Sequence, residues 1–402
     1  MKNKIIFVIG RMASVFGTEI YNFVFALFIL YTTGSAISFA ITLMLEVIPK
    51  ILFSTFAGII SDRYDRKKII IGCDIISGII LLIAYGIYRI QDNMFIIYVL
   101  TFILNAIATM FDITMNASLD MLFEKKHFQQ MCSINEGISS IVAIGAPTLG
   151  AMIYAMTDFS IFLLINGISF LISALMESQL VFHQRVIDNI KHHTFKEEIR
   201  ISIDYISKQR VILVLYLSAI FINIFYNISV ALAFPYIITN ILKLSEMQFG
   251  MLETALAVGM ICGAGFLTVM KNNKSRRSIL TSLCGEGTAI FLLALPVFIT
   301  KDINWFLFYI IVLFTLGFSC SCVNISVRVL MQKIIPSNIK GKVLGTLSAI
   351  CLSISPIFTM TSAAYIDHNN PFTLIVISGI GFMILNAFLL KNKSLKQIPV
   401  TS

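Results

Sequence analysis

The chain has 402 residues, of which 57% are hydrophobic and 13% are charged, and its mean hydropathy is +0.89. Soluble domains carry roughly 25% charged residues, and a soluble fold of this size cannot hide so much apolar surface, so the composition excludes a soluble enzyme, a disordered protein and a nucleic-acid-binding domain. The formal net charge of +9 fits a polytopic membrane protein, because basic residues collect in the cytoplasmic loops of such proteins.

Segments with few or no charged residues recur along the whole chain. A helix needs about 20 residues to cross a hydrocarbon core of about 30 Å, and twelve segments meet this length, so we predict an all-α membrane protein with twelve transmembrane helices. The first segment is read as an uncleaved span rather than a signal peptide, and ten or eleven spans are the alternatives. The predicted spans are 5–31, 37–60, 69–88, 94–117, 133–157, 159–180, 211–239, 247–270, 279–300, 304–327, 343–366 and 370–390.

The basic residues predict the orientation of these spans. If the N-terminus is cytoplasmic, the inner segments hold 26 of the 30 lysines and arginines. The outer loops hold only Arg89, Lys243 and Lys301, and Lys50 lies inside a span. This asymmetry predicts that both termini are cytoplasmic and that the number of spans is even.

The longest hydrophilic stretch divides the spans into two sets of six. We expect an N-terminal bundle over 1–180, a cytoplasmic linker over 181–210 and a C-terminal bundle over 211–402. The linker is either an amphipathic helix on the membrane surface or a solvated tether. Six-helix halves in parallel repeat are a common transporter plan.

A charged motif, GIISDRYDRKK (58–68), lies between the second and third predicted spans. It resembles the signature loop of the major facilitator superfamily, and the whole chain is similar to the drug-exporter branch that includes macrolide and enterobactin exporters. Asp65 stands where the general pattern has glycine, a departure that is common in that branch. The resemblance implies two six-helix bundles and a loop that latches them together when the cytoplasmic side is closed.

The residue types of this loop also predict contacts. Gly58 lacks a side chain, so we expect two helices to approach closely there. Asp62 would face the positive N-terminal end of the eleventh span. The basic residues of the loop would pair with acids or lipid phosphates on the inner face; they are Arg63, Arg66, Lys67 and Lys68. The alternative is that the basic cluster only sets the topology.

The fifth span carries Gly145, Pro147 and Gly150, which resemble an imperfect exporter-type motif. Proline removes a backbone donor and the glycines permit close packing, so we expect a bend and a thin helix face. A plain packing helix is the alternative. Pro356 occupies the corresponding place in the eleventh span, 209 residues further along the chain.

Four ionisable residues fall within the membrane part of the first half: Glu19, Glu46, Lys50 and Asp112. A charge at the bilayer centre costs at least about 2.5–3.5 kcal/mol, and such residues usually face a cavity. Glu46 and Lys50 are spaced i,i+4 and so can pair. We expect the proton-carrying carboxylate to be among Glu19, Glu46 and Asp112. The alternative is a neutralised internal pair that only fixes helix packing.

Polar residues in the seventh span are candidates for substrate contacts. Asn223, Tyr226 and Asn227 lie about one helical turn apart. The 33 phenylalanines and 18 methionines would suit an adaptable apolar cavity, although lipid-facing and core positions are their default interpretation.

These features together predict a secondary active transporter that works by alternating access and exports small amphipathic compounds in exchange for protons. No Gly-rich phosphate-binding motif is present, and we expect no enzymatic activity, cofactor, metal or nucleic-acid partner. The alternatives are a siderophore exporter, a metabolite uptake carrier, or a membrane sensor or scaffold that does not transport. We expect a monomer in the cytoplasmic membrane whose partners are the substrate, protons and lipids.

Overall fold

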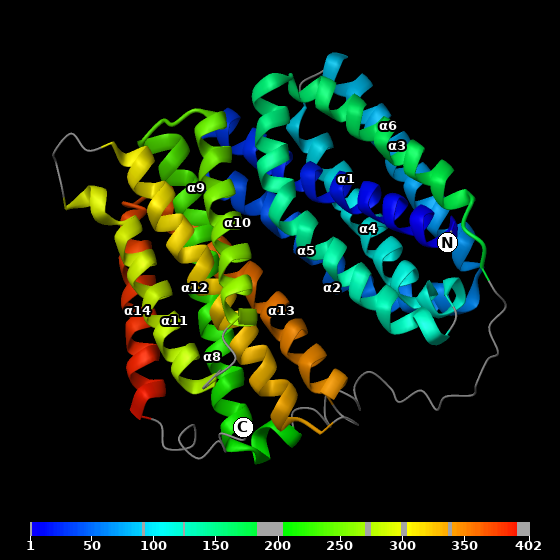
Figure 1. The fold of residues 1–402 in the computed structure, drawn as a ribbon. Coiled ribbons are helices and arrows are strands. Elements are labelled where there is room, and N and C mark those ends of the chain that lie inside the picture. Colours follow the sequence, from blue (N-terminus) through cyan, green and yellow to red (C-terminus); the bar gives the residue numbers. More distant parts are fainter. Residues whose placement is uncertain are drawn as a thin grey trace. The chain divides into compact units, whose positions relative to one another are not determined.

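The computed structural model describes residues 2–90, 93–123, 125–182, 204–269, 275–298, 304–336 and 340–391. Every regular element within these ranges is helical (Figure 1). Residue contacts divide the chain into two compact units. The first comprises Met1–Thr33 and Ile41–Asn189, and the second comprises Gly34–Ala40 and Ile190–Ser402. Most of the expected linker lies outside the described residues.

Six long helices belong to the first half of the chain. They are α1 (Lys2–Thr33), α2 (Ala36–Arg63), α3 (Arg66–Ile90), α4 (Met94–Leu122), α5 (Lys125–Met156) and α6 (Phe159–Ser178). Within the first unit, α1 packs against α5 and α6, and α3 packs against α6 and α4 (Figure 1). Stacked aromatic rings fasten the start of α6 to α1: the Phe28 and Phe159 centroids are 4.0 Å apart.

The second half of the chain is also a set of long helices. It contains α8 (Arg210–Tyr226), η1 (Asn227–Ala233), α9 (Phe234–Tyr236), η2 (Ile237–Ile241), α10 (Glu246–Val269), α11 (Ser275–Leu293), η3 (Leu295–Val297), α12 (Trp305–Ile334), α13 (Lys340–Ile366) and α14 (Phe372–Lys391). Here α12 packs against α10 and α11, α14 packs against α11, and α13 packs against α8 and η1. The elements from α8 to η2 form one continuous helical segment of 32 residues, Arg210–Ile241.

Eleven of the described helices are long and apolar enough to cross a membrane. The twelfth candidate, α11, has a shorter apolar part, Ile279–Leu293. The ninth span was predicted to cover 279–300, but the helix ends at Leu293, so the predicted C-terminal boundary is wrong. Pro296 explains the difference, because proline has no backbone donor and its ring clashes with the preceding turn, and a 3₁₀ turn replaces the helix there.

The outer faces of the helices carry apolar side chains. In α6, the exposed Ile161, Ile165, Ile168 and Ile172 recur at intervals of four, three and four residues. This spacing places them on one helix face. Exposed apolar surface of this extent is unfavourable in water and marks a membrane or protein contact. The pattern supports a lipid-facing surface.

The turn between α1 and α2 is tied to the second half of the chain. Gly34 has a φ of +62°, a conformation that glycine adopts without steric cost. Asp367, just beyond α13, then accepts hydrogen bonds from Ser35 Oγ at 3.1 Å and from the Ala36 backbone N–H at 2.8 Å. A carboxylate at a helix N-terminus satisfies backbone donors and the helix dipole. This contact explains why Gly34–Ala40 belongs to the second unit.

Candidate functional site

The structure brings the four charged candidates of the first half together from α1, α2 and α4. Lys50 Nζ lies 2.9 Å from Glu46 Oε1, and both side chains are about one-third exposed, 33% and 31%. The Glu19 carboxyl lies close enough to Glu46, Lys50 and Asp112 to interact electrostatically with all three. The spacing-based prediction of a Glu46–Lys50 pair is therefore confirmed.

Asp112 has a cation of its own. Arg11 Nη1 lies 2.6 Å from Asp112 Oδ1, and Arg11 Nε donates to Asn135 Oδ1 at 3.1 Å. The guanidinium is buried and also lies 5.5 Å from the centre of the Phe111 ring. Among the three predicted acids, Glu19 is therefore the one for which the described residues provide no ion-pair contact within 4 Å.

Amide pairs accompany these charges and were not predicted from the sequence. Asn22 and Asn105 exchange hydrogen bonds of 3.1 and 3.0 Å between α1 and α4. Asn135 Nδ2 donates to Asn116 Oδ1 at 2.7 Å and so connects α5 to α4. Asparagine within an apolar span is the signal that would have identified them, because a polar side chain in the membrane normally bonds across helices.

The candidates of the second half lie where the seventh span passes from an α-helix into a π-helix. Asn223 and Tyr226 are near the end of α8, and Asn227 begins the π-helical segment η1. Asn227 Nδ2 donates to Asn223 O and Oδ1, both at 2.8 Å. Tyr226 interacts electrostatically with Glu253 and Glu286. π-Helical turns are rare and often occur at functional sites, which supports a role for this junction.

The signature loop is held by Arg66. Its guanidinium is buried, forms an ion pair with Asp62 at 3.0 Å, and donates to the backbone carbonyls of Ser61 and Ala117. Arg66 therefore fixes the loop to α4 rather than reaching lipid, whereas Arg63 is exposed.

Asp65, the departure from the general pattern, caps α3. Its Oδ1 accepts hydrogen bonds from the backbone N–H groups of Lys67 at 2.9 Å and Lys68 at 3.4 Å. A carboxylate before a helix commonly has this role. Asp65 therefore stabilises the start of α3.

The predicted glycine contacts have different outcomes. A Cβ atom built on Gly150 would lie 2.9 Å from Phe23, and one on Gly145 would lie 3.3 Å from Phe16, so both glycines let α5 approach α1 closely. At Gly58 a Cβ atom would meet no described residue within 4 Å, so the close helix approach expected there is not observed. Pro147 and Pro356 lie inside the uninterrupted helices α5 and α13.

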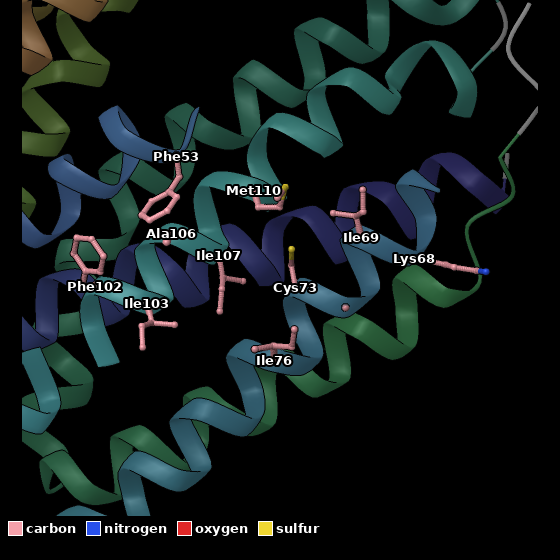
Figure 2. A pocket seen from close by; sticks show the side chains of 11 residues that line it. Phe53, Lys68, Ile69, Cys73, Ile76, Phe102, Ile103, Ala106, Ile107 and Met110 are labelled. Atoms are coloured by element: carbon pink, nitrogen blue, oxygen red, sulfur yellow. The ribbon is translucent and has the colours of Figure 1, made fainter. Parts of the chain in front are cut away.

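An apolar groove opens between α2, α3 and α4 (Figure 2), with a volume of about 510 Å³. Phe53 and Phe102 lie near one end, with ring centroids 6.0 Å apart, and Lys68 lies at the other end and points away from the remaining lining residues. Among the described residues that line the groove, Lys68 is the only charged one, so they offer apolar contacts and no carboxyl group.

Paired charges and amides inside long apolar helices are typical of polytopic membrane proteins, in which such groups are costly in lipid unless they serve transport or packing. The model of the Major Facilitator Superfamily matches residues 7–360 and 215–397 of this sequence. The chain belongs to this superfamily, and it is a secondary transporter rather than an enzyme.

The relatives agree with this family. The chain is 24% identical over 357 residues to the uncharacterized MFS-type transporter YkuC of Bacillus subtilis (strain 168), covering 84% of this chain and 79% of YkuC. It is 21% identical to macrolide efflux protein A of Streptococcus pyogenes, covering 89% and 88%. Among solved structures, the nucleoside transporter NupG is similar in fold, with a TM-score of 0.73, 12% identity and coverage of 99% and 100%.

Proposed function

We propose that the chain exports small amphipathic compounds across the cytoplasmic membrane in exchange for protons, by alternating access and with both termini in the cytoplasm. Relatives named macrolide efflux protein A support the export of such compounds. The observation that carries the coupling is the position of Glu19 beside two ion pairs, without a cation of its own among the described contacts.

The charges of this site leave one carboxyl unbalanced. Lys50 is paired with Glu46, and Arg11 is paired with Asp112. An ionised Glu19 adds a net negative charge to a region where ion solvation is poor. A proton or a cationic substrate group neutralises that charge. Because only one of them can do so at a time, their binding is competitive, and competition at one carboxyl is sufficient to couple the exit of substrate to the entry of a proton.

Glu19→Gln in proteoliposomes tests this proposal. The substituted amide keeps the shape of the side chain but cannot exchange a proton. We expect the variant to lose accumulation of a labelled macrolide and of a lipophilic cationic dye driven by a pH gradient, by at least about tenfold, which corresponds to 1.4 kcal/mol. Counterflow of the same compounds without a pH gradient should continue.

Glu246→Gln is the matched control, because Glu246 lies in the first turn of α10, in the second unit, and is not one of the clustered residues. It should transport like the unmodified protein. Full gradient-driven accumulation by Glu19→Gln would refute the role of Glu19. Loss of gradient-driven accumulation with counterflow retained in Glu46→Gln or Asp112→Asn, while Glu19→Gln is unaffected, would assign the proton to the paired acids instead.

A further inference from the structure

A second group of carboxyls lies in the first unit, apart from the proposed coupling site. Asp74 of α3 and Glu177 of α6 are 2% and 1% exposed, respectively, and face α1. Gly10 of α1 leaves the space: a Cβ atom there would lie 3.2 Å from Glu177 Cγ and 3.8 Å from Glu177 Oε1. Three helices therefore enclose two acidic side chains.

Of the two carboxyls in this enclosure, Asp74 is the one that accepts a hydrogen bond from a neighbouring side chain. Ser14 Oγ donates to Asp74 Oδ2 at 2.6 Å and lies 2.6 Å from Ser173 Oγ. Ser173 Oγ in turn donates to the Gly10 backbone carbonyl at 3.1 Å. Both buried oxygens of Glu177 make no hydrogen bond to the described residues, although Asp74 is close enough to interact electrostatically.

The cation nearest to these carboxyls is already engaged. Arg11, from α1, interacts electrostatically with both Asp74 and Glu177, but its guanidinium contacts Asp112 and Asn135. The other titratable neighbour is the Cys73 thiol, which cannot supply positive charge. The described residues therefore contain two buried carboxyls and no cation bonded to either of them.

We propose that Asp74 and Glu177 form a proton-binding site that keeps Glu177 protonated at neutral pH. Two like charges cannot both be ionised side by side in a region of low dielectric, so one proton must remain. Asp74 accepts a hydrogen bond from the Ser14 hydroxyl at 2.6 Å, which favours its charged form, whereas neither Glu177 oxygen is hydrogen-bonded to the described residues. A protonated Glu177 is uncharged and carries an O–H donor of its own, so it can be buried here without a cation.

The proton has a short route to water. Glu177 is the second-last residue of α6, and the next two residues, Ser178 and Gln179, are exposed. Alkaline pH should therefore remove the proton and place two negative charges between α1, α3 and α6. The repulsion would loosen this helix triad. The proposal concerns proton binding alone and holds whether or not transport is coupled through Glu19.

Infrared difference spectroscopy on the purified full-length protein tests the site directly. A protonated carboxyl gives a carbonyl band that shifts when H₂O is exchanged for D₂O, and raising the pH should remove part of this band. We expect Glu177→Gln to lack that pH-dependent part. Asp204→Asn is the control, since Asp204 is exposed and bound to Lys208, and it should leave the band unchanged.

Thermal unfolding provides the second measurement. Because the folded protein holds a proton that the unfolded chain has already released at neutral pH, the free energy of unfolding should fall as the pH rises until the folded protein has released it too. The isosteric double variant Asp74→Asn/Glu177→Gln has no proton to lose here, so its unfolding temperature should depend less on pH in the alkaline range. An unchanged band and an unchanged pH profile in both variants would overturn the proposal. Loss of the band in Asp74→Asn but not in Glu177→Gln would overturn the assignment of the proton to Glu177.

Discussion

Arg66 is the residue on which the geometry of the signature loop depends. Its planar guanidinium reaches Asp62 and the carbonyls of Ser61 and Ala117 at once, whereas the three donors of a lysine ammonium all lie on one nitrogen at the end of a flexible stem. We expect Arg66→Lys to lower the stability of the purified protein by about 1–3 kcal/mol for each acceptor left without a donor. The loss would be measured as a lower unfolding temperature and a smaller monodisperse fraction.

Arg63→Lys controls for the change in side-chain chemistry, because Arg63 belongs to the same loop but is exposed. It should behave like the unmodified protein. Equal stability of the two variants would mean that the backbone contacts of Arg66 contribute nothing beyond its charge.

The sequence predicted local side-chain contacts better than distant ones. The Glu46–Lys50 pair follows from the i,i+4 spacing alone, since that spacing sets the distance between the two side chains. Arg11 and Asp112 are 101 positions apart, and Glu177 lies 103 positions after Asp74. No periodicity brings such residues together, because their proximity depends on how the helices pack.

Close contact between α10 and α12 is the main packing feature of the second unit at the scale of helices. A Cβ atom on Gly259 would overlap the Phe314 carbonyl oxygen, and one on Gly317 would overlap the Leu256 carbonyl oxygen. Gly259 and Gly263 are four residues apart, the spacing of a close-packing motif in membrane helices. The backbones therefore touch with no room for a side chain.

Gly259→Ala or Gly317→Ala should force these helices apart. Because the obstructing atoms belong to the backbone, they cannot rotate away, and we expect a destabilisation of about 1–3 kcal/mol or more. Unfolding of the detergent-solubilised protein measures this cost. Gly86→Ala in α3 is the control, since a Cβ atom there meets nothing within 4 Å. Equal effects of all three substitutions would show that helix propensity, rather than packing, sets the cost.

Helix existence follows from the sequence more closely than helix winding. Each of the twelve apolar segments overlaps described helical elements, because a span must satisfy all its backbone hydrogen bonds internally. The π-helical turns on either side of Pro235 were not predicted, although a proline within an apolar span was their visible signal. Whether the hydrogen bonds around a proline change from the α-helical to the π-helical pattern depends on how neighbouring helices pack, and hydropathy carries no information about that packing.

At the scale of the whole molecule, hydropathy and charge carry different information. Apolar length predicts which segments cross the membrane, since lipid imposes a minimum span. The distribution of lysine and arginine predicts which loops face the cytoplasm, since translocation disfavours positively charged loops. The charges therefore predict an orientation that apolar length alone does not specify.

Topology reporters test this orientation. Alkaline phosphatase is active only outside the cytoplasm. Green fluorescent protein fluoresces when it remains in the cytoplasm and does not fluoresce when it is exported in unfolded form. Because Arg89 and Lys243 are the sole basic residues of their loops, phosphatase fused after either should be active. Fusions after Phe123 and Ser178 border strongly basic segments, so they should fluoresce and lack phosphatase activity. An export-deficient phosphatase expressed alone sets the background. Active phosphatase after Phe123 would reverse the orientation and place the signature loop, which lies two spans earlier in the chain, on the outer face as well.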